Sequence, residues 1–574
     1  MSGVLKSRVM RRSVAVVGIA LGGVAAVDSS ESGTNGAVKR AAYAFVTAAR
    51  LGMMYKFASR RGWGDSTGDA QRIYSSNMSN AHETGAGLVR RTCEQNGGVY
   101  VKLGQMLAQL DHLLPLAYVE ALRPLLDACP QQPWRTVEKV LKSESPLLLE
   151  HSDIDRAPVA TASLAQVHRA RLKNSDDEIA VKVQHDGLAR HSHWDVRVIQ
   201  SLLLIGAKQF ELLRNMEWLG DELESSLKDE LNFSLEAENC AKCAQNLSQS
   251  STTRDSVLTP KILSEYSSGS VLVMSWEHGV PVDDVAGIRA LGLKPRDVSH
   301  LLASALAEQI FVHGHVHCDP HAANVLVRQH PNHPHSPQLV VLDHGLYRTL
   351  APELRLGYAR LWMAIACGDR DTIYNCAKEL GVDGEQNAKM LAMMLTLRPW
   401  DIIELDRGEH SVDHAALELV RGSDEMSDEV RKRIHDFIVE NHDSMGKVLS
   451  SVPRELLLIF KTSDCVRAIE RRLGAHWGWL QATARISSQV VADHERLIAR
   501  ERAANTSSSH PWSPARLSSN AGLVLTWTRV SLNRAILELQ LALLSLLGTS
   551  PAQSSQNASP SLTTTSAPSP SETE

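Results

Sequence analysis

The sequence predicts an α+β protein made of more than one structural unit. The chain has 574 residues, more than one hydrophobic core usually supports. Short apolar runs of strand character lie between residues 159 and 345 and are separated by polar turns. The segments on either side show the three- and four-residue spacing of amphipathic helices. We therefore expect a strand-containing middle region with helical segments before and after it.

The composition is that of a folded protein and argues against two kinds of function. Apolar residues make up 43% of the chain and charged residues 22%, which is ordinary for a globular protein. The formal net charge of -5 and the lack of a long basic stripe argue against nucleic-acid binding. The eight cysteines are scattered and form no disulfide framework. Cys240 and Cys243 form a CxxC without a second pair, so a zinc or redox role is the less favoured alternative. The histidines between residues 313 and 335 match no metal-ligand spacing and are expected in loops or lining a site.

The N-terminus, residues 1–37, has the features of a targeting or anchor segment. Basic residues precede an apolar run at 13–27, and no acid occurs before Asp28. This run is shorter than the roughly 20 residues that span a bilayer as a helix. The pattern fits a mitochondrial presequence and also a secretory signal. We favour mitochondrial import with membrane anchoring. The basic helix expected at 38–61 either lies on an anionic membrane surface or, as we favour, joins the anchor to the folded domain.

A first candidate phosphate contact lies on the helix predicted over residues 96–110. Lys102 and Gln105 are three residues apart and share one face, while leucines and Met106 cover another. Such a pair can reach into a phosphate site, although an ordinary amphipathic helix has the same pattern.

A second candidate site follows in the strand region. The small residues Ala160, Thr161, Ala162 and Ser163 precede a strand and would let backbone N–H groups approach phosphates. Lys182, pointing inward from the strand at 179–183, would neutralise the α- and β-phosphates. It needs an acidic partner, and the helical segment 221–239 offers Glu230 and Glu236.

Residues 317–345 form two strand-loops that predict a metal-binding hairpin. Asp319 and Asn324 lie on one loop, and Asp343 follows the second strand. In phosphoryl transfer an Asp orients or deprotonates the attacking hydroxyl, while an Asn and a second Asp hold Mg²⁺. The alternative is a surface hairpin with ordinary turn residues, but both halves in this order favour the site. Residues 328–337 are expected to form a turn or exposed loop between the strands.

With these residues in this order, the chain resembles the UbiB family of atypical kinases, also called aarF-domain-containing kinases, over roughly residues 85–474. Lys102-Leu103-Gly104-Gln105 resembles the KxGQ signature of the family, and Ala160-Thr161-Ala162-Ser163 resembles its alanine-rich nucleotide loop. His317-Cys318-Asp319-Pro320-His321 is similar to its HxDPH catalytic loop. Asp343-His344-Gly345, in place of a DFG, and residues 457–464 resemble the mitochondrial branch that is not the dedicated coenzyme Q factor.

The resemblance implies a two-lobed protein-kinase-like fold. The expected parts are a helical extension at 38–150, an N-lobe at 151–280, a helical C-lobe at 281–548 and a disordered Ser/Thr/Pro tail at 549–574. The KxGQ helix would pack over the active site, and the strand containing Met274 would lead into the adenine-binding linker. ATP and Mg²⁺ are the implied cofactors, with ATPase activity or small-molecule phosphoryl transfer favoured over protein phosphorylation. A mitochondrial inner-membrane or intermembrane-space setting and a role in lipid or quinone homeostasis are further implications.

Some positions depart from the family pattern. Ala322-Ala323 stand where Pro-Gly is common, Thr161 where a second Ala is common, and Asn232 where an Asp is common. The Asn232 change leaves Glu230 as the favoured partner of Lys182, with Glu236 second. Residues 351–353 follow Asp343 too closely to close an activation segment and are expected to begin a helix.

Helical spacing continues after that point, and three function hypotheses remain open. Helices are predicted at 354–367, 371–380, 388–397, 428–441, 454–473 and 521–548, the last one packing on the lobe. An active Mg-dependent ATP-using enzyme is favoured, followed by a nucleotide-gated scaffold that binds lipid or protein partners without turnover. A conventional protein kinase is the third hypothesis.

Overall fold

The computed structural model describes residues 35–60, 68–108, 110, 114–127, 129, 131–214, 216, 218–398, 400–403, 448–449, 451–475 and 478–505. The predicted targeting segment up to residue 34, the helices at 428–441 and 521–548, and the tail lie outside these residues. The chain divides into two compact units. The first comprises residues 1–355, 380–382 and 438–482, and it contains every candidate site residue.

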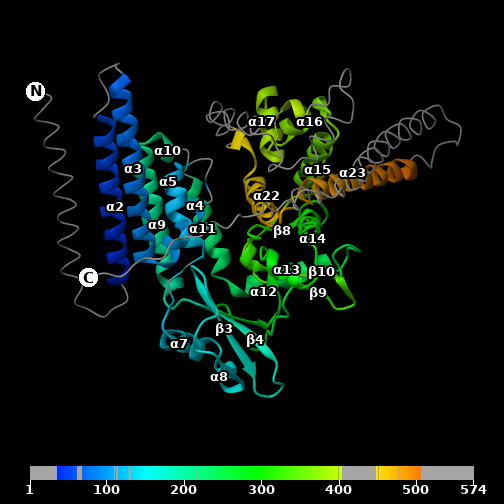
Figure 1. Ribbon diagram of the computed structural model, residues 1–574, viewed down its shortest axis with the longest axis horizontal. Helices are drawn as coiled ribbons and strands as arrows, with labels where there is room; N and C mark the ends of the chain where they lie inside the picture. Colours follow the sequence, from blue (N-terminus) through cyan, green and yellow to red (C-terminus); the bar gives the residue numbers. More distant parts are fainter. Residues whose placement is uncertain are drawn as a thin grey trace, which may run out of the picture. The chain divides into compact units, whose positions relative to one another are not determined.

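The first unit begins with packed helices that precede and follow the first strands (Figure 1). These are α2 (Asn35–Arg60), α3 (Gly68–Asn96), α4 (Gly98–Ala108), α5 (Leu116–Leu122), α6 (Pro124–Asp127), α9 (Leu188–Ala207), α10 (Glu211–Arg214) and α11 (Trp218–Glu230). Gly97 and Gly98 have φ of +66° and +47°. Because other residues rarely adopt this left-handed conformation, these glycines let the chain turn between α3 and α4.

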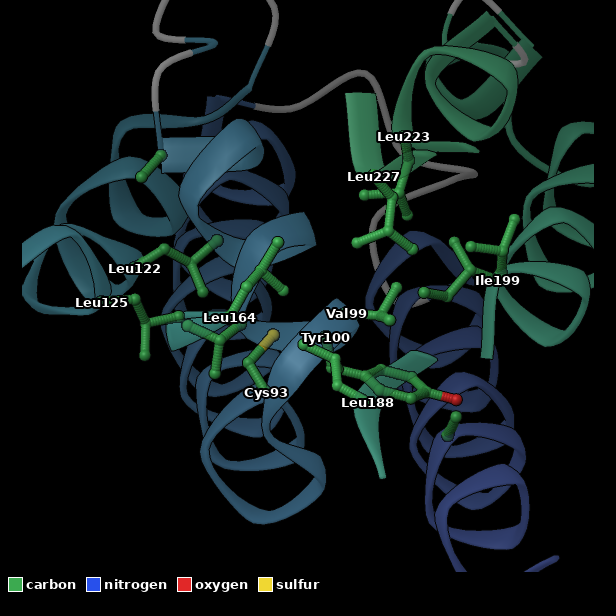
Figure 2. Close-up of a cluster of buried hydrophobic side chains, with 14 residues drawn as sticks. Cys93, Val99, Tyr100, Leu122, Leu125, Leu164, Leu188, Ile199, Leu223 and Leu227 are labelled. Atoms are coloured by element: carbon green, nitrogen blue, oxygen red, sulfur yellow. The ribbon is translucent and has the colours of Figure 1, made fainter. Parts of the chain in front are cut away.

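Helix α4, which contains the KxGQ sequence, forms the centre of this helical region. Its Val99 and Tyr100 meet leucines from α5, α9 and α11 in one apolar cluster (Figure 2). A Cβ at Gly104 would lie 2.5 Å from a methyl group of Leu125 and 3.1 Å from the sulfur of Cys93. A glycine at this position therefore allows α4 to pack closely against its neighbours. Leu164, which directly follows the alanine-rich loop, is buried in the same cluster.

An antiparallel sheet follows, with strand order β1-β3-β4-β6 and β2 paired with β3. Its strands are β1 (Ser152–Ile154), β2 (Ala160–Thr161), β3 (Ala165–Leu172), β4 (Glu178–Gln184) and β6 (Val271–Ser275). Alternate side chains pack on opposite faces. Val181 and Val183 face α7 (Trp134–Glu144) and α8 (Pro146–His151), and Ala180 and Met274 face α12 (Phe233–Leu247). Lys182 therefore lies on the α12 face, with Ala180 and Met274.

A second sheet has the order β5-β10-β9-β7, formed by β5 (Val257–Leu258), β7 (Val280–Pro281), β9 (Val325–His330) and β10 (His333–Val341). The prediction of a loop over residues 328–337 was wrong, because β9 and β10 stay paired out to His330 and His333. The turn contains only Pro331 and Asn332. The ladder shifts register between His333 and Pro337, which accommodates prolines that cannot donate a ladder hydrogen bond.

The remaining elements are mainly helical. In the first unit they are α13 (Val285–Ala290), α14 (Pro295–Glu308), the π-helical turn Gln309–His313, β8 (His315–His317), the 3-10 turn Ala322–Asn324, β11 (Tyr347–Thr349) and α22 (Arg454–Leu473). Elsewhere the chain forms α15 (Pro352–Ala366), α16 (Arg370–Glu379), α17 (Glu385–Thr396), α18 (Trp400–Ile403) and α23 (Gly478–Asn505). Helix α15 begins at Pro352, as predicted. Of the helices described, none combines the length and the apolar character needed to cross a membrane.

Candidate functional site

Lys182 connects the sheet, α12 and the loop after β10. Its Nζ lies 2.6 Å from Glu236 Oε1 and 2.9 Å from Asp343 Oδ2. The Lys182 side chain is 12% exposed and that of Glu236 is 3% exposed. The ring of Phe233 lies 5.3 Å from the ammonium group, where a cation is favoured. Residues far apart in the sequence therefore meet at one lysine.

The predicted partner of Lys182 was wrong. Glu230 instead pairs with Lys102 at 2.7 Å, while Glu236 takes the place beside Lys182. The cause is a break between two helices: α11 ends at Glu230, and Asn232 caps α12 by accepting the N–H groups of Ser234 and Leu235. A continuous helix over 221–239 does not form, so the two glutamates are directed to two different lysines.

Burial and neighbouring charges shift the pKa values of Lys182, Asp343 and Glu236 in different ways. Burial lowers the pKa of Lys182, but the charges of Asp343 and Glu236 outweigh it and raise the pKa above its ordinary value. Burial acts to raise the pKa of Asp343, yet the Lys182 charge and the Gly345 N–H hold it below its ordinary range. For Glu236 burial prevails over Lys182 and raises the pKa to about 7. Lys182 and Asp343 are therefore the charged pair, and Glu236 changes protonation near neutral pH.

The loop carrying Asp319 is fixed by backbone contacts to a buried histidine. His317, in β8, donates its N–H to the side chain of Gln309, and its Nδ1 accepts the N–H of Asp319 at 3.1 Å. Because Nδ1 accepts, the ring is neutral. Burial lowers the pKa of His317 to about 4, which agrees with that state. This histidine shapes the loop and does not supply a charge.

Asp319, Asn324 and Asp343 are linked through the backbone of their loops. The Nδ2 of Asn324 donates to the carbonyl oxygen of Asp319 at 3.3 Å. The carbonyl oxygen of Asn324 accepts the N–H of Leu342 at 2.8 Å, and Leu342 directly precedes Asp343. The structure therefore brings together the three residues predicted to orient the hydroxyl and hold Mg²⁺.

One further cation, not among the residues predicted for this site, lies beside Asp319. Lys461, from α22, lies 3.0 Å from Asp319 Oδ1. Burial raises the pKa of Asp319, but the charges of Lys461 and Lys102 outweigh it and hold the pKa below its ordinary range. The next residue, Thr462, is fully buried and donates to the carbonyl oxygen of His317 at 3.3 Å. Helix α22 therefore supports the loop with two consecutive side chains.

His344 holds the loop that carries Asp343. Its Nε2 bonds the carbonyl oxygen of Val341 at 3.0 Å, and its Nδ1 bonds the hydroxyl of Tyr347 at 2.9 Å. Burial lowers the pKa of His344 to about 3. The Gly345 N–H donates to Asp343 Oδ1 at 2.9 Å. A neutral, buried histidine in this position sets the direction of the Asp343 carboxylate.

The alanine-rich loop lies at the level of Lys182. The strand register pairs Ala160 with Val167, and Val167 with Lys182. The Ala162 N–H donates to the carbonyl oxygen of Ala165 at 2.8 Å and closes the turn. Thr161 Oγ1 is buried and has no hydrogen-bond partner among the described residues. The loop is therefore separated from the strand that carries the lysine by β3 alone, and it contains one unsatisfied polar atom.

Comparisons with known proteins agree with this arrangement. Residues 124–377 match the ABC1 atypical kinase-like domain. A putative ABC1 protein of Arabidopsis thaliana is 34% identical, over 79% of this chain and 82% of that protein. AarF domain-containing protein kinase 1 of Xenopus laevis is 36% identical, over 70% of this chain and 74% of that protein. The chain belongs to the ABC1/AarF family of atypical kinases. The resemblance to the UbiB family and the predicted α+β, two-lobed kinase-like fold are thereby confirmed, and a kinase-like activity follows at family level.

Two further similarities are more limited. The probable serine/threonine-protein kinase abkD of Dictyostelium discoideum is 36% identical over 69% of this chain, which spans only 54% of that longer protein. A solved complex of a Mycobacterium tuberculosis protein, Rv3197, with erythromycin aligns with a TM-score of 0.40 and 20% identity, over 73% of this chain and 98% of that chain. A similarity of that size supports no conclusion about this site.

The two polar residues of the KxGQ sequence have different surroundings in this ABC1/AarF chain. Lys102 pairs with Glu230, and its charge acts on Asp319. Gln105 donates to the carbonyl oxygen of Leu125 at 2.8 Å. The amide of Gln105 therefore holds α6, and the predicted role of Lys102 and Gln105 in nucleotide binding stays a prediction.

Asp343 and Asn324 fit the Mg²⁺ expected of a kinase-like site. Asp343 is ionised and 36% exposed, and each of its oxygens receives one donor, which leaves lone pairs for a cation. Asn324 uses Nδ2 as a donor, so its amide oxygen would serve as the ligand. Within the residues described, no group of three or more His, Cys, Asp or Glu could hold a metal ion by itself. These two residues would therefore share the ion with phosphate oxygens, as is usual for Mg²⁺.

Proposed function

We propose that this ABC1/AarF protein binds Mg-ATP and hydrolyses it or transfers its terminal phosphoryl group to a small molecule. The observation that carries the proposal is the contact of Lys182 with both Glu236 and Asp343, at 2.6 and 2.9 Å. A kinase-like site needs a strand lysine held by a helix glutamate and a metal-binding Asp within reach of the phosphates. Both requirements are met at one point.

The nucleotide would contact the α12 side of the N-lobe sheet. Ala165, Ala180, Leu272 and Met274 form a buried apolar cluster with Phe233 on the side of the sheet that carries Lys182. Apolar side chains of this kind suit the edge of an adenine ring, and Ala165 directly follows the alanine-rich loop. The backbone of residues 160–163, with the hydroxyl of Thr161, would face the phosphates.

Each polar residue then has a distinct role in the proposed reaction. Lys182 would bind the α- and β-phosphates, and Asp319 would accept the proton of the attacking hydroxyl. Asn324 and Asp343 would hold Mg²⁺, which supplies charge neutralisation at the phosphate oxygens. Glu236 positions Lys182 and does not itself contact substrate. Glu230, through Lys102, would keep the extension close to Asp319.

A membrane-associated, mitochondrial role in lipid or quinone homeostasis remains part of this proposal. Helix α2 supports it, because it contains no acidic residue and several of its aromatic and basic side chains are exposed. The exposed residues of this kind are Lys39, Tyr43, Phe45, Arg50, Lys56 and Phe57. Aromatic and cationic side chains on one helix favour an anionic lipid surface. The division into domains at residues 150, 280 and 548 stays a prediction.

The test is ATP hydrolysis by the purified full chain with Mg²⁺, with and without mitochondrial lipids. Asp319→Asn removes the proton acceptor and should lower the rate roughly 10²–10⁴-fold, and Asp343→Asn should have an effect of similar size. The control is Asp153→Asn, an exposed carboxylate in β1, which should leave the rate unchanged. Unaltered rates in both site variants would refute catalysis here. Tight ATP binding without hydrolysis would favour the scaffold alternative.

A further inference from the structure

Among the lysines of the site, Lys461 is the one that forms its ion pair with Asp319, the candidate proton acceptor. Lys182 contacts Glu236 and Asp343, and Lys102 contacts Glu230. Lys461 contacts Asp319 alone among the ion pairs described. Its side chain is 26% exposed, and an ammonium group carries three donors. Lys461 can therefore take a second partner without leaving Asp319.

The position of Lys461 is fixed by its helix. The hydroxyl of Thr462 donates to the carbonyl oxygens of His317 and Leu458, at 3.3 and 3.0 Å. Ile459, Thr462 and Ser463 are buried on α22. The base of the lysine is thus held against the Asp319 loop, while its side chain is partly exposed.

We propose that Lys461 binds the terminal phosphate of a nucleoside triphosphate and neutralises the charge that develops on the transferred phosphoryl group. The attacking hydroxyl must lie within hydrogen-bond reach of Asp319, and the phosphorus lies roughly 3–3.5 Å from the attacking oxygen. A cation 3.0 Å from Asp319 Oδ1 is therefore within a side-chain rotation of the phosphoryl oxygens. This inference rests on the proposed function and adds a catalytic residue to it.

The bond changes of the step leave Lys461 in the same protonation state. A bond forms between the oxygen of the attacking hydroxyl, or of water, and the terminal phosphorus. The bond between that phosphorus and the bridging oxygen breaks, and the nucleoside diphosphate leaves with the electron pair. The hydroxyl proton goes to Asp319. Lys461 keeps its three protons and supplies charge stabilisation, the principal form of catalysis in this class of reaction.

The test compares the affinities for two nucleotides that differ by the terminal phosphate. Adenylyl imidodiphosphate with Mg²⁺ carries that phosphate, and ADP with Mg²⁺ lacks it. We expect Lys461→Met to weaken binding of the triphosphate analogue roughly 10- to 100-fold, the range of a lost charged hydrogen bond, and to leave ADP binding within about twofold. Lys461→Arg should restore most of the preference for the triphosphate analogue over ADP. Lys461→Met should also lower kcat for ATP.

The matched control is Arg471→Met, an exposed cation near the end of the same helix. It should leave both affinities unchanged. If Lys461→Met does not fold, as judged by thermal unfolding, Lys461→Gln removes the charge and provides the same comparison. Equal loss of both nucleotides, or no loss of either, would show that Lys461 only holds the loop and would overturn the proposal. Failure of the unmodified protein to bind either nucleotide would instead refute the proposed function.

Discussion

Lys182 and Lys461 form ion pairs of different kinds on the two sides of the same site. Lys182 is 12% exposed, contacts two carboxylates and is covered by Phe233. Lys461 is 26% exposed and contacts Asp319, which is 22% exposed. Lys182 is held by two protein carboxylates, whereas Lys461 is held by one and is more exposed. Lys182 is therefore the more firmly held of the two cations, and Lys461 is the one expected to change partners more easily.

Removal of Lys182 should lower the free energy of unfolding more than removal of Lys461. When one partner of a buried ion pair is removed, the charge left behind has neither water nor a counter-charge. When one partner of a partly exposed ion pair is removed, the free energy of unfolding falls little, because water replaces the missing partner. The two lysines therefore allow structural and chemical contributions to be measured separately.

The largest expected effect is on the stability of Lys182→Met. It leaves the buried Glu236 without its cation, and the free energy of unfolding should fall by about 3–5 kcal/mol. Lys461→Met should lower it by at most about 1 kcal/mol. Urea unfolding of both variants without nucleotide measures the contrast. The double variant Lys182→Met, Glu236→Gln is the control and should recover part of the loss. Equal destabilisation by the two lysine substitutions would contradict the comparison.

A pH dependence of intermediate size should come from Glu236. Its pKa in the folded protein is raised to about 7, above the value near 4.5 in an unfolded chain. The folded state therefore binds more protons between these values, and the contribution of Glu236 to stability is present below about pH 4.5 and is lost as the pH rises towards 7.

Glu236→Gln imitates the protonated glutamate and should remove this dependence. The unmodified protein should lose about 1–3 kcal/mol relative to the variant as the pH rises from 5 to 8. Urea unfolding at several pH values measures the difference between the two proteins. A constant difference over this range would show that Glu236 is ionised throughout, with Lys182 as its permanent counter-charge.

The site residues that lie in strands or in the loops directly beside them could be predicted from the sequence. Lys182 lies in a strand whose alternation directs it to the face opposite Val181 and Val183, and the structure places it 2.9 Å from Asp343. Asp319 and Asn324 lie in a loop bounded by short strands, and the hairpin brings them to Asp343. The roles of these residues stay predictions, but their proximity followed from strand periodicity and order along the chain.

The ion-pair and hydrogen-bond partners that depend on packing between distant segments could not be predicted from strand periodicity or order along the chain. Lys461 lies on a regular helix, where nothing in the local spacing marks it as a partner of Asp319. Gln105 shares a helix face with Lys102, yet α6 presents a carbonyl oxygen that binds its amide. Only the tertiary arrangement of α4, α6 and α22 decides these contacts. The wrong choice between Glu230 and Glu236 has a more local cause, which can be tested.

The smallest expected effect comes from the residue that separates those two glutamates. Asn232 caps α12, with its side-chain oxygen 3.2 and 3.4 Å from the nitrogens of Ser234 and Leu235. Asn232→Ala removes both hydrogen bonds and should lower the free energy of unfolding by about 1 kcal/mol. Asn232→Asp retains an N-cap acceptor and should change it by only a few tenths of a kcal/mol. Urea unfolding at pH 7 measures both variants. If Asn232→Ala proved as stable as the unmodified protein, the cap would not be what ends α11 and directs Glu230 to Lys102 and Glu236 to Lys182.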